Sequence, residues 1–454
     1  MICISIPDNN KKERKYILDI FFNEFLGLSY RIVENTDIKN WEIELENGSK
    51  LIIEDHFFNK YPTELNYLKL ENIPSKVEYV ENEFTPEDDI PIIYGNSKLE
   101  LQNDKIICGI DIFASSFFML TRWEEYVNKN RDSHDRFPAY ESLAYKQGFL
   151  ERPIVNEYIE MLWEMLLLLG QTQKRKKREY RVRPTHDIDK PYKFPNVLKT
   201  ITELIGDLVK RRSIHAFFLN VKAFCNYTIN NYDPYITYNY LMDLSEKYQL
   251  TSHFYILYSQ NSKYDGNYRL SKNKMKDIIL NIQKRGHHIG IHYSYNSYLE
   301  RELLWNEKKY LEKQFNIKIN SGRNHYLRFR TPDSWQVYNN SGIEIDSTVG
   351  FVERIGFRSG TCYNYNTFNV LTSKVLNLKE NPLLIMDSSY FVYNQGSISK
   401  DEFMAKCFKI VDIVRRYRGE LVILWHNSTF FDFNDTITYE KLLHYSHTIE
   451  TSND

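Results

Sequence analysis

The segment RPTHDIDKP, residues 183–191, decides how the second half of the chain folds, because an extended run here ends in a polar turn. Asp187 and Asp189 stand at the end of the expected strand. Two carboxylates separated by one residue point the same way if the strand stays extended, and such a pair can share a metal ion and the role of a general base. An Asp-rich turn before Lys190 and Pro191 is the structural alternative.

Strand-like and helical patterns alternate after this segment, which predicts βα units and a mainly parallel sheet or barrel. Apolar residues recur at helical spacing in 275–282, where Gly286 suits the helix end, and again in 403–414. We interpret both stripes as core. In parallel α/β architectures the carboxyl ends of the strands gather around one site, so polar residues distant in sequence can converge there.

Three further segments place polar side chains where an apolar run stops. They are GHHIGIHYSYNS (286–297), GRNHYLRF (322–329) and ELVILWHNS (420–428). His292 ends the first run, and imidazole at a strand end is a natural ligand for zinc or a similar divalent ion. The second segment offers Arg323 and His325, and the third is a buried strand whose polar ending, with His426, is expected at the mouth of the site.

Composition excludes several classes of protein. The 454 residues carry a formal net charge of −1, so no global charge attracts nucleic acid or an anionic membrane. Five scattered cysteines indicate neither a disulfide framework nor a thiolate zinc site. The sequence has no phosphate-binding glycine loop, signal peptide or transmembrane segment, so we expect a cytoplasmic protein that does not bind nucleic acid. Its oligomeric state is not predicted.

The clearest boundary is QTQKRKKREYRVR, residues 171–183, which contains five consecutive cations. We interpret it as a solvated basic linker between a smaller mixed α+β domain at 1–170 and a second domain at 184–454. A nucleic-acid or phosphate patch is the alternative, but no aromatic residues interleave with these charges. Just before the boundary, an apolar run between Pro153 and Gly170 predicts a helix over 154–169.

The order of the segments resembles the polysaccharide deacetylases of carbohydrate esterase family 4, the NodB-homology domain, over roughly residues 183–428. THDID (185–189) resembles the family motif TFDDG, and SHFYIL (252–257) resembles its TFF strand. RGHHIGIHYSYN (285–296) resembles its GHEIGxH motif. RNHY (323–326) resembles its R-x-P-Y motif, and ILWHN (423–427) resembles its Leu-x-His motif. The chain also resembles an uncharacterised bacterial branch found near surface-polysaccharide genes, which has its own N-terminal domain. That similarity rests on three segments, FFMLTRWEEY (117–126), RFPAYESLAY (136–145) and HYLRF (325–329).

The resemblance implies a distorted (β/α) barrel that hydrolyses an N-acetyl group from an amino sugar of a bacterial surface polysaccharide or its precursor. In the family the first motif aspartate is the base and the second binds metal, which assigns these roles to Asp187 and Asp189. The inserted Ile188 departs from the family pattern.

His292 matches the first metal histidine of the family, but the second, four residues on, is Asn296 here. Asn296 could coordinate through its amide oxygen, or His325, which replaces the proline of R-x-P-Y, could reach the metal. We favour His325, because a neutral imidazole is the better zinc ligand. Loss of metal and of activity is a third reading.

The expected mechanism needs a divalent metal, zinc first and cobalt or nickel otherwise. Asp187, oriented by Arg323, would accept a proton from water, and His426 as an imidazolium would protonate the departing amine. The expected metal ligands are Asp189, His292 and either His325 or Asn296.

Two other functions stay open. A barrel with two carboxylates can also host a metal-independent glycosidase, which would survive a chelator. A catalytically degenerate barrel could instead serve as a glycan-binding or scaffold protein of polysaccharide assembly, and the missing second histidine favours that reading. In each case the partner is an N-acetylated glycan or a sugar precursor.

Overall fold

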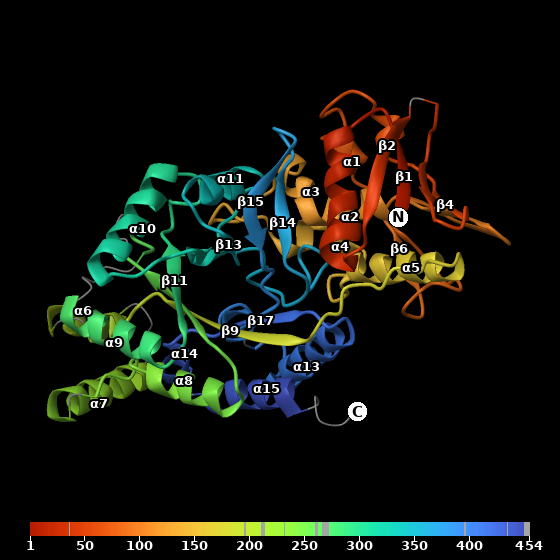
Figure 1. Ribbon diagram of the computed structural model, residues 1–454. Helices are drawn as coiled ribbons and strands as arrows, with labels where there is room; N and C mark the ends of the chain where they lie inside the picture. The colour runs from red at the N-terminus through yellow and green to blue at the C-terminus, as the bar shows by residue number, and fades with distance from the viewer. Residues whose placement is uncertain are drawn as a thin grey trace. The chain divides into compact units, whose positions relative to one another are not determined.

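The computed structural model describes residues 1–35, 37–194, 197–209, 214–230, 232–258, 262–265, 272–394, 396–433 and 435–448. They form two compact units, each built from several stretches of the chain (Figure 1). Unit 1 comprises Met1–Arg181, Leu327–Leu384 and Lys409–Leu421, and unit 2 comprises Val182–Tyr326, Ile385–Phe408 and Val422–Asp454. This division differs from the predicted domains 1–170 and 184–454, because two later stretches contact the N-terminal residues.

Unit 1 contains a six-stranded mixed sheet in the order β2-β1-β3-β4-β8-β7. Its strands are β1 (Ile2–Pro7), β2 (Tyr30–Asn35), β3 (Trp41–Glu44), β4 (Lys50–Ile53), β7 (Gly95–Gln102) and β8 (Lys105–Ile110). β1 pairs parallel with β2 and antiparallel with β3, and β8 pairs parallel with β4 and antiparallel with β7.

The helices of unit 1 contribute many of its buried apolar side chains. They are α1 (Lys11–Leu18), α2 (Ile112–Thr121), α3 (Trp123–Val127), α4 (Leu143–Lys146), α5 (Ile154–Leu168) and α11 (Asp333–Asn340). Every residue of α2 is buried, and α2 packs against α1 and α5. The predicted helix over 154–169 is confirmed as α5, and Gly170 follows it with a φ of +88°, a left-handed conformation that favours glycine.

Shorter strands complete unit 1. β5 (Glu78–Val80) pairs antiparallel with β6 (Ile90–Ile92), and β15 (Lys374–Glu380) pairs antiparallel with β14 (Tyr365–Asn369) and parallel with β13 (Ile345–Asp346).

In unit 2 six strands follow the order β12-β11-β10-β9-β17-β16. They are β9 (Arg181–Ile188), β10 (His253–Leu257), β11 (His288–Tyr293), β12 (Ser321–Asn324), β16 (Ile385–Met386) and β17 (Glu420–Leu424). The run from β9 to β12 is parallel, with Asp187 beside Tyr255 and His292 beside Arg323. The predicted mainly parallel sheet is therefore confirmed here, whereas this linear order does not confirm the predicted distorted (β/α) barrel.

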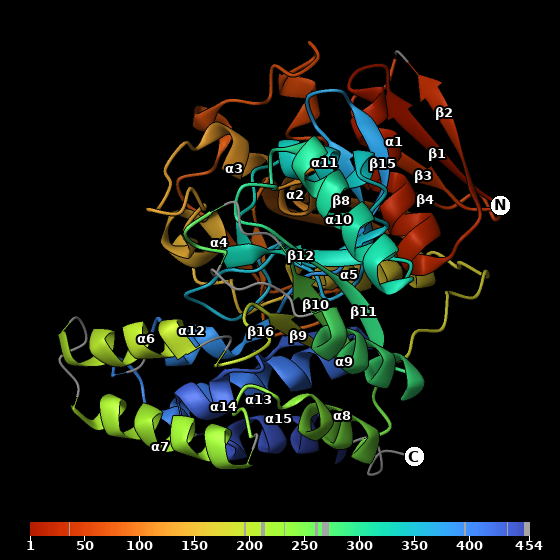
Figure 2. The ribbon, with the colours of Figure 1, turned by 90° about the vertical axis from the view of Figure 1, so that its left-hand side faces the viewer.

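Helices separate these strands in the sequence. They are α6 (Val197–Val209), α7 (Ile214–Asn230), α8 (Tyr238–Lys247), α9 (Lys272–Lys284), α10 (Arg301–Phe315), α12 (Asp387–Phe391), α13 (Lys400–Arg416), α14 (Thr429–Asp432) and α15 (Ile437–Thr448). α9 and α10 contact β11, and α8 lies between α9 and α15 along one side of the strands (Figure 2). Over the described ranges, none of the helices combines the length and the apolar character that crossing a membrane requires.

Candidate metal centre

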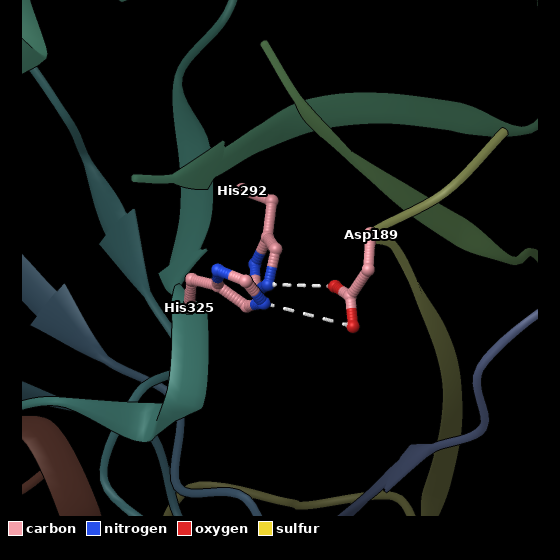
Figure 3. Close-up of side chains that lie close together, drawn as sticks. All are labelled: Asp189, His292 and His325. Carbon is pink, nitrogen blue, oxygen red and sulfur yellow. Dashed lines mark ion pairs between the residues drawn. The ribbon is translucent and has the colours of Figure 1, made fainter. Parts of the chain in front are cut away.

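Three side chains at the carboxyl ends of parallel strands of unit 2 form a candidate metal site. Asp189 follows β9, His292 lies near the end of β11, and His325 follows β12. Because these strands are parallel, their carboxyl ends meet at one edge, and one ligand atom of each side chain lies within 4.8 Å of the others. Nε2 of His292 is 3.2 Å from Oδ1 of Asp189, and Nε2 of His325 is 3.7 Å from Oδ2 (Figure 3).

The other nitrogen of each imidazole is engaged by the protein. Nδ1 of His292 donates to the backbone carbonyl of Arg323 at 2.9 Å. Nδ1 of His325 lies 3.1 Å from Oδ1 of Asp265, which also accepts from the backbone N–H of Tyr295 at 2.6 Å. Such outer partners fix the ring orientation and leave Nε2 directed at the metal in known metal sites. Both rings are therefore presented to Asp189 as metal ligands would be.

The polar atoms of the cluster fit a divalent cation. Oδ1 of Asp189 is buried and accepts no hydrogen bond from any described residue, although Nε2 of His292 is close. In the neutral imidazole that nitrogen carries a lone pair, since Nδ1 is the donor, so two acceptors face each other. A cation between them resolves this conflict, and two imidazoles with one carboxylate are a donor set that suits zinc.

The electrostatics of the cluster also favour a cation. Burial alone would raise the pKa of Asp189, but the positive charges of His325 and His426 hold it well below its usual range. Burial likewise lowers the pKa of His325, but Asp189 and Asp265 outweigh it and raise that pKa to about 9. In the absence of metal, the negative charge of these carboxylates keeps His325 protonated at neutral pH. The same negative charge would attract a divalent cation.

Asp187 is fixed beside the cluster by a buried arginine. Nη1 of Arg323 donates to Oδ1 of Asp187 at 2.9 Å and to Oγ1 of Thr185 at 2.9 Å. The guanidinium carbon also lies 5.1 Å from the ring centre of Tyr255. Oδ2 of Asp187 is 3.7 Å from Nδ1 of His292. One carboxylate oxygen is therefore held by a charge-assisted hydrogen bond, and the other faces the cluster.

His426 approaches the same centre with a carboxylate behind it. Its Nδ1 lies 2.7 Å from Oδ1 of Asp387, whose Oδ2 accepts from the backbone N–H of His426 at 2.8 Å and from the Thr429 hydroxyl. Its Nε2 lies 3.9 Å from Oδ2 of Asp189. Burial lowers the pKa of His426, but the charge of Asp387 and the hydrogen bond to it dominate and raise that pKa to about 10.

Asn296 is more exposed than His325, the alternative ligand. It is exposed in the turn after β11, whereas His325 is buried within the cluster. Of the two alternatives for the missing ligand, the geometry therefore favours His325, and its role as a ligand stays a prediction.

Sequence reasoning did not single out Asp265 and Asp387. Asp265 lies in a loop with no flanking strand signal, so the sequence offers no clue to it. Asp387 directly follows the apolar run 383–386, and the rule that polar residues after such runs reach the site would have found it.

A family of unknown function, DUF7033, matches residues 2–170. No curated protein matches. The matching solved structures include polysaccharide deacetylases of low sequence identity.

A structure from Mycobacterium smegmatis, described as a polysaccharide deacetylase, is 12% identical with a TM-score of 0.40, over 62% of this chain and 87% of its own. One from Pseudomonas aeruginosa PAO1, also described as a polysaccharide deacetylase, is 14% identical with a TM-score of 0.33, over 46% of this chain and 65% of its own. At TM-scores of 0.40 or less, such likeness does not establish a common function, and the side chains of unit 2 have to decide it.

Proposed function

We propose that the protein is a metal-dependent hydrolase that removes the N-acetyl group from an amino sugar of a bacterial surface polysaccharide or its precursor. The supporting observation is that three kinds of group lie around Asp189: two imidazoles whose Nε2 atoms face it, a carboxylate fixed by Arg323, and an imidazole fixed by Asp387. Amide hydrolysis by a metal enzyme needs a metal that polarises the carbonyl, a general base and a general acid. The two imidazoles with Asp189 would hold the metal, the carboxylate would be the base, and the remaining imidazole would be the acid.

Asp189, His292 and His325 would hold the cation, with zinc as the preferred ion and cobalt or nickel as substitutes. When bound, a divalent cation would supply a Lewis acid that polarises a carbonyl oxygen and makes a water molecule more acidic. Asp265 and the carbonyl of Arg323 would keep the two rings in place while substrate enters.

Asp187 serves as the general base in this proposal. Arg323 donates a hydrogen bond to its Oδ1, which leaves Oδ2 to accept the proton of the attacking water. The hydroxyl then adds to the carbonyl carbon of the acetamide. Burial of Arg323 keeps the pair apart from bulk water and prevents the carboxylate from rotating away.

His426 serves as the general acid. Its Nδ1 is committed to Asp387, so the proton on Nε2 is the one available to the departing nitrogen. When the C–N bond breaks, that proton converts the leaving group to an amine, and acetate is the second product. The raised pKa of His426 means that the imidazolium is the starting form at neutral pH.

Acetate release from N-acetylated oligosaccharides tests the proposal. Untagged protein should release acetate, lose this activity with a chelator and regain it with added zinc, cobalt or nickel. Chelator-resistant release of reducing ends would instead identify the metal-independent glycosidase. Saturable glycan binding without either product, in the metal-loaded protein, would identify the glycan-binding or scaffold protein.

A further inference from the structure

Unit 1 has a cavity of about 720 Å³ that the proposed hydrolase does not use. Its walls come from the segment 175–178, the end of α13 with the turn that follows it (416–418), the loop 83–86 and one face of α5. The cations that line it are Arg175, Lys176, Lys177, Arg178, Arg416 and Arg418, and the acids are Glu83, Glu160 and Glu164. Cavities of this volume hold small-molecule ligands in other proteins.

The basic segment 171–183, predicted to be a solvated linker, makes contacts within unit 1 beside this cavity. The backbone N–H of Lys176 donates to the carbonyl of Leu26 at 2.6 Å. The Arg178 guanidinium donates to the carbonyl of Glu24 at 2.9 Å and lies 3.7 Å from the ring centre of Tyr363. The segment therefore contacts other residues of unit 1 through its backbone and through Arg178, whereas the side chains of Lys176 and Lys177 are exposed.

The cavity is lined by more positively than negatively charged side chains. Arg175 pairs with Glu160 at 2.6 Å, and Arg416 pairs with Glu87. Within the described part of the chain, no carboxylate pairs with the side chains of Lys176, Lys177 or Arg418, and Arg178 donates to backbone carbonyls. Like charges held side by side repel one another, so an anionic ligand would stabilise this arrangement.

Aromatic and apolar side chains share the lining with these cations. They are Phe25, Phe84, Tyr363, Tyr417, Leu26 and Ile159. The sequence argument against a phosphate patch was the lack of aromatic residues near the basic run, and the folded chain supplies them from four distant segments. The cavity therefore offers both charge for an anion and apolar surface for the remainder of a ligand.

We propose that this cavity binds a ligand that joins one or two phosphate groups to an apolar or ring-shaped portion. The guanidinium and ammonium groups would neutralise the phosphate oxygens, and the aromatic rings would contact the other portion. Nucleoside diphosphates and isoprenoid diphosphates share this chemistry. The proposal is independent of the hydrolase, since every lining residue belongs to unit 1.

Isothermal titration calorimetry of the full chain tests it with inorganic pyrophosphate, uridine diphosphate and farnesyl diphosphate as probes. The test variant is the double substitution Lys177→Gln and Arg418→Gln, because both side chains are exposed and their loss should leave the fold intact. Lys174→Gln, an exposed cation of the same basic run that does not line the cavity, is the matched control. Thermal unfolding of each variant checks that its stability is unchanged.

We expect saturable binding of pyrophosphate, weakened about tenfold or more by the double substitution and less than about twofold by the control. Tighter binding of the uridine or the farnesyl compound than of pyrophosphate would identify the second portion as a nucleoside or an isoprenoid. Absence of saturable binding by all three probes would overturn the proposal. Equal binding by wild type and double variant would also overturn it, because the phosphates would then bind elsewhere.

Discussion

Asp265→Asn should weaken metal binding without removing a ligand. Among the described residues of the candidate centre, Asp265 contacts His325, whose Nδ1 lies 3.1 Å from its Oδ1. The substitution keeps the shape of the side chain but removes its negative charge. The substitution therefore measures how much the negative charge of Asp265 strengthens metal binding by Nε2 of His325.

The expected size of the effect follows from the contacts of Asp265. Its Oδ1 holds both His325 and the backbone N–H of Tyr295, and its Oδ2 is buried and unpartnered among the described residues. The carboxylate therefore acts on the metal mainly through one imidazole. Changes to such outer partners weaken metal affinity by about 10- to 100-fold, or about 1.4–2.8 kcal/mol.

Competition with a fluorescent zinc chelator measures this affinity directly. Asp277→Asn is the matched control, because Asp277 is an exposed carboxylate on α9 of the same unit. The control should bind zinc as the wild type does. Equal zinc affinity of Asp265→Asn and wild type would refute the reasoning, since His325 would then not be a ligand that Asp265 supports.

The remaining predictions concern the acid, its partner and the buried ion pair. His426→Ala should lower turnover by about 10²–10⁴ while metal still binds, and loss of metal in that variant would instead make His426 a ligand. Asp387→Asn should lower the pKa of His426 from about 10 toward its ordinary value, because the neighbouring negative charge is lost; an unchanged value in an NMR titration of the metal-free protein would contradict this. Arg323→Met leaves Asp187 buried without its cation and should cost about 3–5 kcal/mol in urea unfolding, whereas a loss below about 1 kcal/mol would show that the pair is not needed for stability.

The sequence was most informative where local pattern and burial agree. Apolar spacing between a proline and a glycine identified α5 within one residue of its observed end. The apolar run before His292 placed that residue near the end of β11, because a strand with both faces covered needs apolar side chains up to its exposed end.

Contacts between distant segments were harder to predict. Whether Asn296 or His325 joins Asp189 depends on how far β12 extends, and sequence spacing does not determine that distance. Asp265 reaches His325 from a loop, which has no periodic signal. The contacts of the basic run could not be predicted, because its partners are distant in sequence. Arg178 donates to backbone carbonyls of residues 24–25 and lies against the ring of Tyr363.

Metal content by mass spectrometry, on untagged protein equilibrated with zinc, cobalt or nickel, tests the central claim most directly. The proposed centre predicts about one metal ion per chain, lost in His292→Ala and His325→Ala and retained in Asn296→Ala. Retention in His325→Ala with loss in Asn296→Ala would move the third ligand to the asparagine. Protein without stoichiometric metal under all three conditions would contradict the proposed metal-dependent hydrolase.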